Sequence, residues 1–143
     1  MTPDALFQLA NMIALAGWLV LLASPWLPSV ADRVSGIAIP LLLSVGYAGL
    51  ILAFWFRSEG GFDSLDNVAL LFRTRELLLA GWVHYLAFDL FVGAWSVRVA
   101  RREGIWFPLV VPCLVLTFLF GPVGLLVFSA LRFSRPRGQP QLS

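Results

Sequence analysis

Charge is scarce in this chain of 143 residues. Only 13% of the residues are charged, against roughly 25% in soluble domains, whereas 59% are apolar. All ten basic residues are arginines, and they form no continuous basic stripe interleaved with aromatic side chains. The composition therefore favours a membrane protein and argues against a nucleic-acid-binding protein.

Residues that bind metals or form disulfides are also nearly absent. Cys113 is the only cysteine, which excludes a disulfide within the chain, and His84 is the only histidine. A zinc site with several histidines from one chain is therefore excluded. The sequence has no glycine-rich phosphate loop and no Gly-x-Ser-x-Gly nucleophile elbow. We expect neither a metal nor another cofactor.

Long apolar runs dominate what is present. About 20 helical residues cross the ~30 Å hydrocarbon core of a membrane. Four stretches are long enough, at about 5–24, 36–56, 77–97 and 106–131. We predict an all-α, integral membrane four-helix bundle over residues 1–132, with both termini on one side, and a disordered tail over 133–143. No basic residue precedes the first stretch, so we interpret it as a retained helix and not a secretory signal.

The connections between these stretches carry two further signals. Glu59-Gly60-Gly61 predicts a turn, after which Ser64 can cap a short interfacial helix that ends near Phe72. With four spans, the side of the termini carries six arginines and the other side carries four, namely Arg33, Arg98, Arg101 and Arg102. The positive-inside rule then favours cytoplasmic termini by a small margin.

Two ionisable residues lie near the middle of the third stretch. At ~1.5 Å per residue, His84 and Asp89 fall within about 5 Å of its centre. An aspartate at this depth costs roughly 2.5–3.5 kcal/mol on insertion scales, so it should face the interior, be protonated or have a partner. Five residues at about 100° each place the two side chains ~140° apart, where both can border one interior arc. Such residues usually mark a functional site, but each can instead tie helices together through hydrogen bonds.

Other polar residues can either complete a pocket or serve packing. The Asn11 amide can bond to Asp89, to His84 or to a substrate oxygen, or it can link two helices. Tyr47 can join the pocket or bond to a neighbouring helix. A carboxylate at Glu76 suits the start of a helix through the helix dipole, which is the alternative to a catalytic role.

The fourth stretch contains two interior prolines. Pro112 and Pro122 each remove a backbone hydrogen bond, so each should bend the helix and free a carbonyl group that needs a partner. A kinked helix beside the polar third helix can form one wall of a pocket.

The chain resembles the abscisic-acid-deficient-four-like family in three stretches, namely Phe7-Gln8-Leu9-Ala10-Asn11, Gly81-Trp82-Val83-His84-Tyr85-Leu86-Ala87-Phe88-Asp89-Leu90-Phe91-Val92-Gly93, and Phe120-Gly121-Pro122-Val123-Gly124. The Trp-x-His-x-x-x-x-Asp-Leu-Phe core is the specific part of this resemblance. Plant members are required for neoxanthin synthesis from violaxanthin, so the resemblance implies a membrane protein that acts on a carotenoid or a related isoprenoid. The compact chain is similar to a bacterial member, which implies a multi-pass protein of the bacterial cytoplasmic membrane.

The resemblance also implies a chemistry. Converting an epoxide end group to an allenic alcohol is an isomerisation without a redox cofactor. It requires a proton donor to the epoxide oxygen and a base for the adjacent polyene carbon. The resemblance implies Asp89 as the acid and His84 as the base, although the two roles can be exchanged. The substrate contacts that we expect are Asn11, Tyr47, Glu76, Tyr85, Trp18 and Trp82.

Two alternatives to an isomerase remain. A non-catalytic carotenoid- or lipid-binding protein would need the pocket but would tolerate loss of Asp89. A structural membrane subunit would use His84 and Asp89 for packing or for a partner's helix. Each version involves membrane lipid and can form a homo-oligomer, and the first two also bind a lipophilic small molecule.

Overall fold

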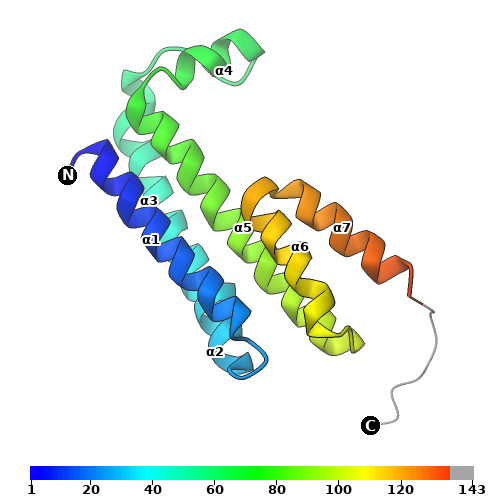
Figure 1. Ribbon diagram of the computed structural model, residues 1–143. Helices are drawn as coiled ribbons and strands as arrows, with labels where there is room; N and C mark the ends of the chain where they lie inside the picture. The colour runs from blue at the N-terminus through cyan, green and yellow to red at the C-terminus, as the bar shows by residue number, and fades with distance from the viewer. Residues whose placement is uncertain (136–143) are drawn as a thin grey trace.

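A computed structural model describes residues 1–135, which form helices and turns with no strand among them (Figure 1). In chain order the elements are α1 (Pro3–Leu22), α2 (Pro28–Arg33), the π-helical η1 (Val34–Ala38), α3 (Ile39–Phe54), the 3₁₀ turn η2 (Trp55–Arg57), α4 (Leu65–Leu71), α5 (Arg75–Glu103), α6 (Phe107–Phe120) and α7 (Pro122–Phe133). The all-α prediction is confirmed. Most of the predicted disordered tail, residues 136–143, lies outside the described part of the chain.

Three helices are long and apolar enough to cross a membrane. They are α1, the continuous helix Pro28–Arg57 that runs from α2 through η2, and α5. Large apolar side chains such as Met12, Val45 and Leu52 remain exposed on their outer faces. A surface of this kind fits contact with lipid acyl chains, so the structure supports association with a membrane.

The short helix in the connection before α5 was also predicted. The Ser64 hydroxyl accepts a hydrogen bond from the backbone N–H of Asn67 at 3.1 Å and caps α4. Gly60 adopts a positive φ of 95° in the turn before it. The prediction of a turn followed by a capped helix is therefore confirmed.

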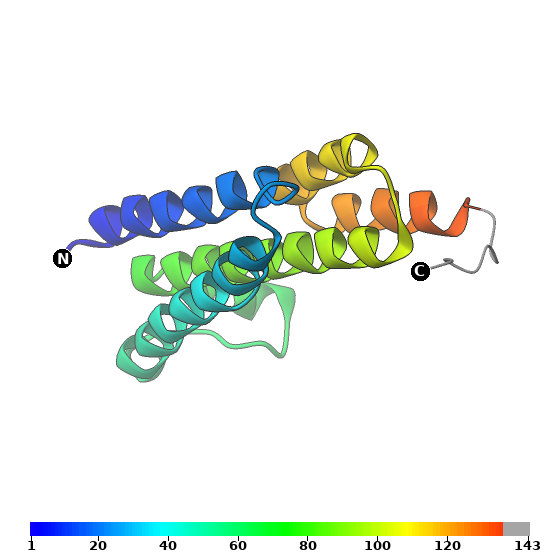
Figure 2. The same ribbon diagram turned by 90° about the horizontal axis from the view of Figure 1, so that it is seen from below.

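α5 is the central helix of the fold. α1 lies along α5 from its start to Gly93, α3 lies beside its N-terminal half, and α6 and α7 lie beside its C-terminal half (Figure 2). Two glycines allow α1 and α5 to approach closely: a Cβ on Gly17 would lie 2.6 Å from the Leu90 side chain, and one on Gly93 would lie 2.7 Å from Trp18. The buried Ser35 hydroxyl of η1 donates to the Gly17 carbonyl at 2.6 Å, which ties the second long helix to the first.

The predicted single helix over residues 106–131 is wrong, because the chain reverses direction at Gly121. Gly121 has a φ of 37°, which favours glycine, and Pro122 lacks an N–H and begins α7. α7 then packs back against α6 (Figure 1). With 14 and 12 residues, α6 and α7 are about 21 and 18 Å long, too short to cross ~30 Å of hydrocarbon. A hairpin of two short helices therefore replaces the fourth span of the expected bundle.

This hairpin also changes where the chain ends. Asp4 pairs with Arg75 at 2.5 Å at the start of α5, whereas Arg132 pairs with Glu103 at 2.7 Å at its end. The start of α1 and the end of α7 thus lie at opposite ends of α5 (Figure 1). The prediction of both termini on one side is wrong for the described residues, because α6 and α7 together make a return and not a crossing.

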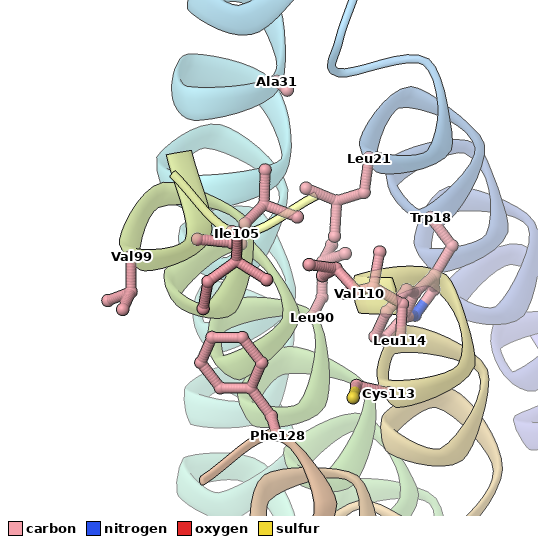
Figure 3. Close-up of a cluster of buried hydrophobic side chains, with 13 residues drawn as sticks. Trp18, Leu21, Ala31, Leu90, Val99, Ile105, Val110, Cys113, Leu114 and Phe128 are labelled. Carbon is pink, nitrogen blue, oxygen red and sulfur yellow. The ribbon is translucent and has the colours of Figure 1, made fainter. Parts of the chain in front are cut away.

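A core of apolar side chains holds the hairpin against α5. Figure 3 shows Trp18, Leu90, Val110, Leu114 and Phe128 gathered where α1, α5, α6 and α7 meet. Leu90, Val110 and Phe128 have no exposed surface. The hairpin is therefore an integral part of the packed structure.

Candidate functional site

An aromatic groove of about 570 Å³ lies between the N-terminal parts of α1 and α5. Phe7, Phe72, Trp82 and Tyr85 contribute to its walls, and the ion-paired Asp4 and Arg75 lie at the end nearest the helix starts. Ligand pockets typically measure about 300–1,000 Å³, with mostly apolar walls and a few polar groups. The groove has the size and character to hold part of a lipophilic molecule.

Trp82 organises the walls of this groove. Its ring lies 5.2 Å from that of Tyr85, in a stacked arrangement, and 5.5 Å from that of Phe7. Its indole N–H donates to the side-chain oxygen of Asn11 at 2.7 Å. Asn11 therefore links α1 to α5 through Trp82 and not through His84 or Asp89. Of the expected contacts, Trp82 and Tyr85 line the groove and Asn11 supports it from behind.

Tyr85 connects the groove to the α6–α7 hairpin. Its hydroxyl donates to the backbone carbonyl of Phe118 at 3.1 Å. In a continuous helix that carbonyl would accept from residue 122, but Pro122 has no N–H. Tyr85 therefore satisfies a carbonyl that the proline leaves free, as the sequence predicted for this kind of break. Thr117, by contrast, bonds to the carbonyl of Cys113 in its own helix at 2.8 Å.

Asp89 lies one helical turn after Tyr85 and faces the same break. Its carboxyl is a neighbour of the Tyr85 hydroxyl, and its Oδ2 atom is buried without a hydrogen-bond partner among residues 1–135. A Cβ on Gly121 would lie 2.7 Å from Asp89 Oδ1. The missing side chain at Gly121 thus makes room for the carboxyl, and the turn of the hairpin is built around it.

His84 faces a different cavity, of about 250 Å³, between α3, α4 and α5. Its ring meets that of Tyr47 edge-on at 5.6 Å and lies 4.8 Å from that of Phe88. The prediction that His84 and Asp89 border one interior arc is therefore wrong. Their separation of about 140° turns one toward α3 and α4 and the other toward α6 and α7.

Phe72 and Gly81 line both the groove and the His84 cavity. A Cβ on Gly81 would lie 3.2 Å from the Phe72 ring, so the glycine lets the ring rest on α5 and separate the two spaces. A role for Phe72 between the two spaces was not predicted from the sequence. The available signal was Gly81 itself, because a glycine within an apolar helix permits close approach of a neighbour.

Two other predicted contacts lie outside both spaces. Trp18 is 5% exposed and belongs to the packed core beside Gly93. Glu76 lies in the first turn of α5, where its charge suits the helix dipole, and lines neither cavity. A third, wholly apolar groove of about 350 Å³ lies between α1, α3 and α5 and contains none of the predicted residues. In the described part of the chain, no three His, Cys, Asp or Glu side chains come together to hold a metal.

Comparison with protein families gives a match over residues 5–128 to the family described as ABA DEFICIENT 4-like. The matched region begins after Asp4 and includes Trp82 and Tyr85 of the groove, His84, Asp89 and the break at Gly121. The resemblance seen in the sequence is thereby confirmed. No curated protein and no solved structure matches the chain.

Proposed function

Because this chain belongs to the ABA DEFICIENT 4-like family, we propose that it is a membrane-embedded isomerase that acts on a carotenoid or a related isoprenoid. The family and the long apolar helices fit a carotenoid-related membrane protein. One observation supports the isomerase in particular. A buried carboxyl oxygen of Asp89 has no hydrogen-bond partner in residues 1–135, and the carboxyl lies beside Tyr85, a wall of the aromatic groove. A lipophilic molecule in the groove would therefore bring a polar group close to a proton donor.

In the proposed reaction, Asp89 acts as the acid in its neutral form. It donates a proton to the epoxide oxygen, through or beside the Tyr85 hydroxyl, as the C–O bond breaks and the oxygen becomes a hydroxyl. The neighbouring polyene carbon loses its proton to the Asp89 carboxylate, and the electron pair of that C–H bond forms the new double bond. The substrate keeps its composition and Asp89 regains its proton, so the step needs no oxidant or reductant.

This mechanism departs from the sequence hypothesis in the base. His84 lines the other cavity and is separated from the groove by Phe72 and Gly81. We therefore assign both proton transfers to the Asp89 carboxyl, which has two oxygens and can give a proton with one and accept a proton with the other.

The test is turnover of violaxanthin by the purified protein in lipid nanodiscs, with the products separated by chromatography. Asp89→Asn keeps the shape of the side chain but not its acidity, so we expect a loss of at least about 100-fold. Asp66→Asn is the matched control, because Asp66 is exposed in α4 and lines neither the groove nor the His84 cavity, and it should retain full turnover. Turnover by Asp89→Asn equal to that of the wild type would exclude the mechanism.

A non-catalytic lipid-binding protein is the second candidate, and one observation favours it. The groove is lined by Tyr85 but not directly by Asp89, so a ligand can occupy it without touching the carboxyl. In that case the wild type and Asp89→Asn would retain the same amount of violaxanthin after purification, and neither would convert it.

A further inference from the structure

The His84 cavity contains two polar side chains that the proposed reaction does not use. Tyr47 comes from α3 and His84 from α5, and their rings face each other edge-on at 5.6 Å. None of the side-chain hydrogen bonds within residues 1–135 involves either residue, in contrast to Asn11 and Tyr85 at the groove. His84 is exposed and Tyr47 is half-buried, but both belong to long apolar helices of a kind that crosses a membrane. A polar side chain without a hydrogen-bond partner is costly in contact with lipid, so an unpaired phenol and imidazole beside one cavity point to a ligand.

The remaining walls are aromatic and aliphatic. The rings of Trp55 and Phe62 pack on each other with their centroids 5.1 Å apart, and Phe72 forms the side next to the groove. Aromatic walls favour a flat or cyclic ligand, because rings stack or meet edge to face.

The segment that covers the cavity is held in place. The Asn67 side chain donates to Asp63 at 2.7 Å, and the backbone N–H of Gly61 donates to the Asn67 carbonyl at 3.2 Å. The Ser64 cap starts α4 in the same segment, and Leu71 at its end is 2% exposed. The cavity is therefore bordered by fixed elements of the fold, and it is open on the side of Phe62, which is 71% exposed.

The chemistry of the two polar groups restricts the ligand. A phenol both donates and accepts a hydrogen bond, and a neutral imidazole donates from one nitrogen and accepts at the other. A hydroxyl group matches both partners, since it also donates and accepts. A cation would find no carboxylate among the residues that line this cavity, and an anion would find no arginine there.

The volume restricts the ligand further. About 250 Å³ is below the usual range of about 300–1,000 Å³ for drug-sized ligands, so the space suits a single ring. We propose that the cavity between Tyr47 and His84 is a second ligand site, separate from the groove, that binds a lipophilic ring carrying a hydroxyl group. The ring packs among Trp55, Phe62 and Phe72, and its hydroxyl bonds to the phenol and the imidazole.

The single histidine provides a direct test. Protein labelled with ¹⁵N-histidine and purified through a tag without histidine gives the ring-nitrogen signals of a single imidazole, that of His84. We would titrate nanodiscs with thymol, a ring with a hydroxyl, and with p-cymene, the same ring without it. Thymol should shift the imidazole signal saturably and bind about two- to tenfold more tightly than p-cymene, the range expected for one net hydrogen bond.

Two variants sharpen this test. Tyr47→Phe should weaken thymol binding by about two- to tenfold and leave p-cymene unchanged. Ser44→Ala is the control, because it removes an α3 hydroxyl that already bonds to the Pro40 carbonyl of its own helix at 2.7 Å. A thymol shift that does not saturate, equal binding of the two rings, or full thymol affinity in Tyr47→Phe would each overturn the proposal. Asp89→Asn should bind thymol normally, so failure of the proposed isomerase and failure of this site are distinguishable.

Discussion

The two halves of α5 both bury one face of the helix, but they differ in the space beside them. In the C-terminal half, Leu90, Ala94 and Ala100 are 3% exposed or less. In the N-terminal half, Leu78 is 54% exposed and Phe88 is 59% exposed, and all three cavities lie along this part of the helix. One half of the helix thus serves as scaffold and the other leaves room for ligands, with Asp89 at the boundary between them.

The sequence of α5 explains this difference. Small residues such as Gly93, Ala94 and Ser96 line the C-terminal half, so neighbouring helices approach closely. Trp82 and Tyr85 in the N-terminal half are bulky, and they line the groove there. A carboxyl at the boundary is positioned by the packed half while it remains close to the open half, which is the arrangement that the proposed acid requires.

The largest expected difference concerns the two ends of α5, which differ in charge. Arg57, Arg73 and Arg75 lie near its start, whereas the other end carries Arg33, Arg98, Arg101, Arg102, Arg132 and Arg135. The positive-inside rule therefore predicts that the C-terminal end of α5 lies in the cytoplasm and that its start lies outside, together with the N-terminus. Four spans would imply the opposite side for the N-terminus and for the start of α5.

Cysteine labelling of intact cells tests this orientation in an all-or-none manner. In a Cys113→Ala background, Glu59→Cys should react with an impermeant maleimide added outside, because residue 59 is exposed beyond the start of α5. Ser134→Cys should react only after the cells are opened. Labelling of both positions from the same side would show that the hairpin does not return.

The next largest effect compares one leucine from each half of α5. Leu90→Ala should lower the free energy of unfolding by about 2–5 kcal/mol, because Leu90 is fully buried between α1 and the hairpin. Leu78→Ala should change it by only about 0.5 kcal/mol, since Leu78 is half exposed beside the groove. Unfolding by titration with a denaturing detergent measures both. Equal losses would mean that the two halves contribute equally to stability.

The helices that could be predicted from the sequence were those set by local composition. α1, Pro28–Arg57 and α5 follow from uninterrupted apolar runs. The break at Gly121 could not be predicted in this way. α6 runs through Pro112 without ending, so a proline alone does not show where a helix ends. What ends the helix is a positive φ at Gly121 together with the Tyr85 hydroxyl and the Asp89 carboxyl on another helix. Those partners are distant in sequence.

The candidate site shows the same limit. His84 and Asp89 stand out in any apolar helix, and their angular separation follows from helix geometry. Which neighbour covers each face depends on the tertiary arrangement, and this arrangement placed the two residues in different spaces. Trp18 was expected at the substrate, but Gly93 opposite it leaves a space in the core that its ring fills.

The smallest expected effect concerns the link between α1 and α5 in the open half. Trp82→Phe keeps the aromatic wall but removes the 2.7 Å bond to Asn11, so it should cost about 0.5–1.5 kcal/mol of unfolding free energy. A double-mutant cycle with Asn11→Ala, measured in the same detergent titration, should give a coupling energy near 0.6 kcal/mol, typical of such bonds within membranes. Strictly additive losses would mean that the bond does not hold the groove together. A coupling of this size would be several times smaller than the Leu90→Ala loss, as expected if packing around the hairpin stabilises the fold and the groove remains free to open for a ligand.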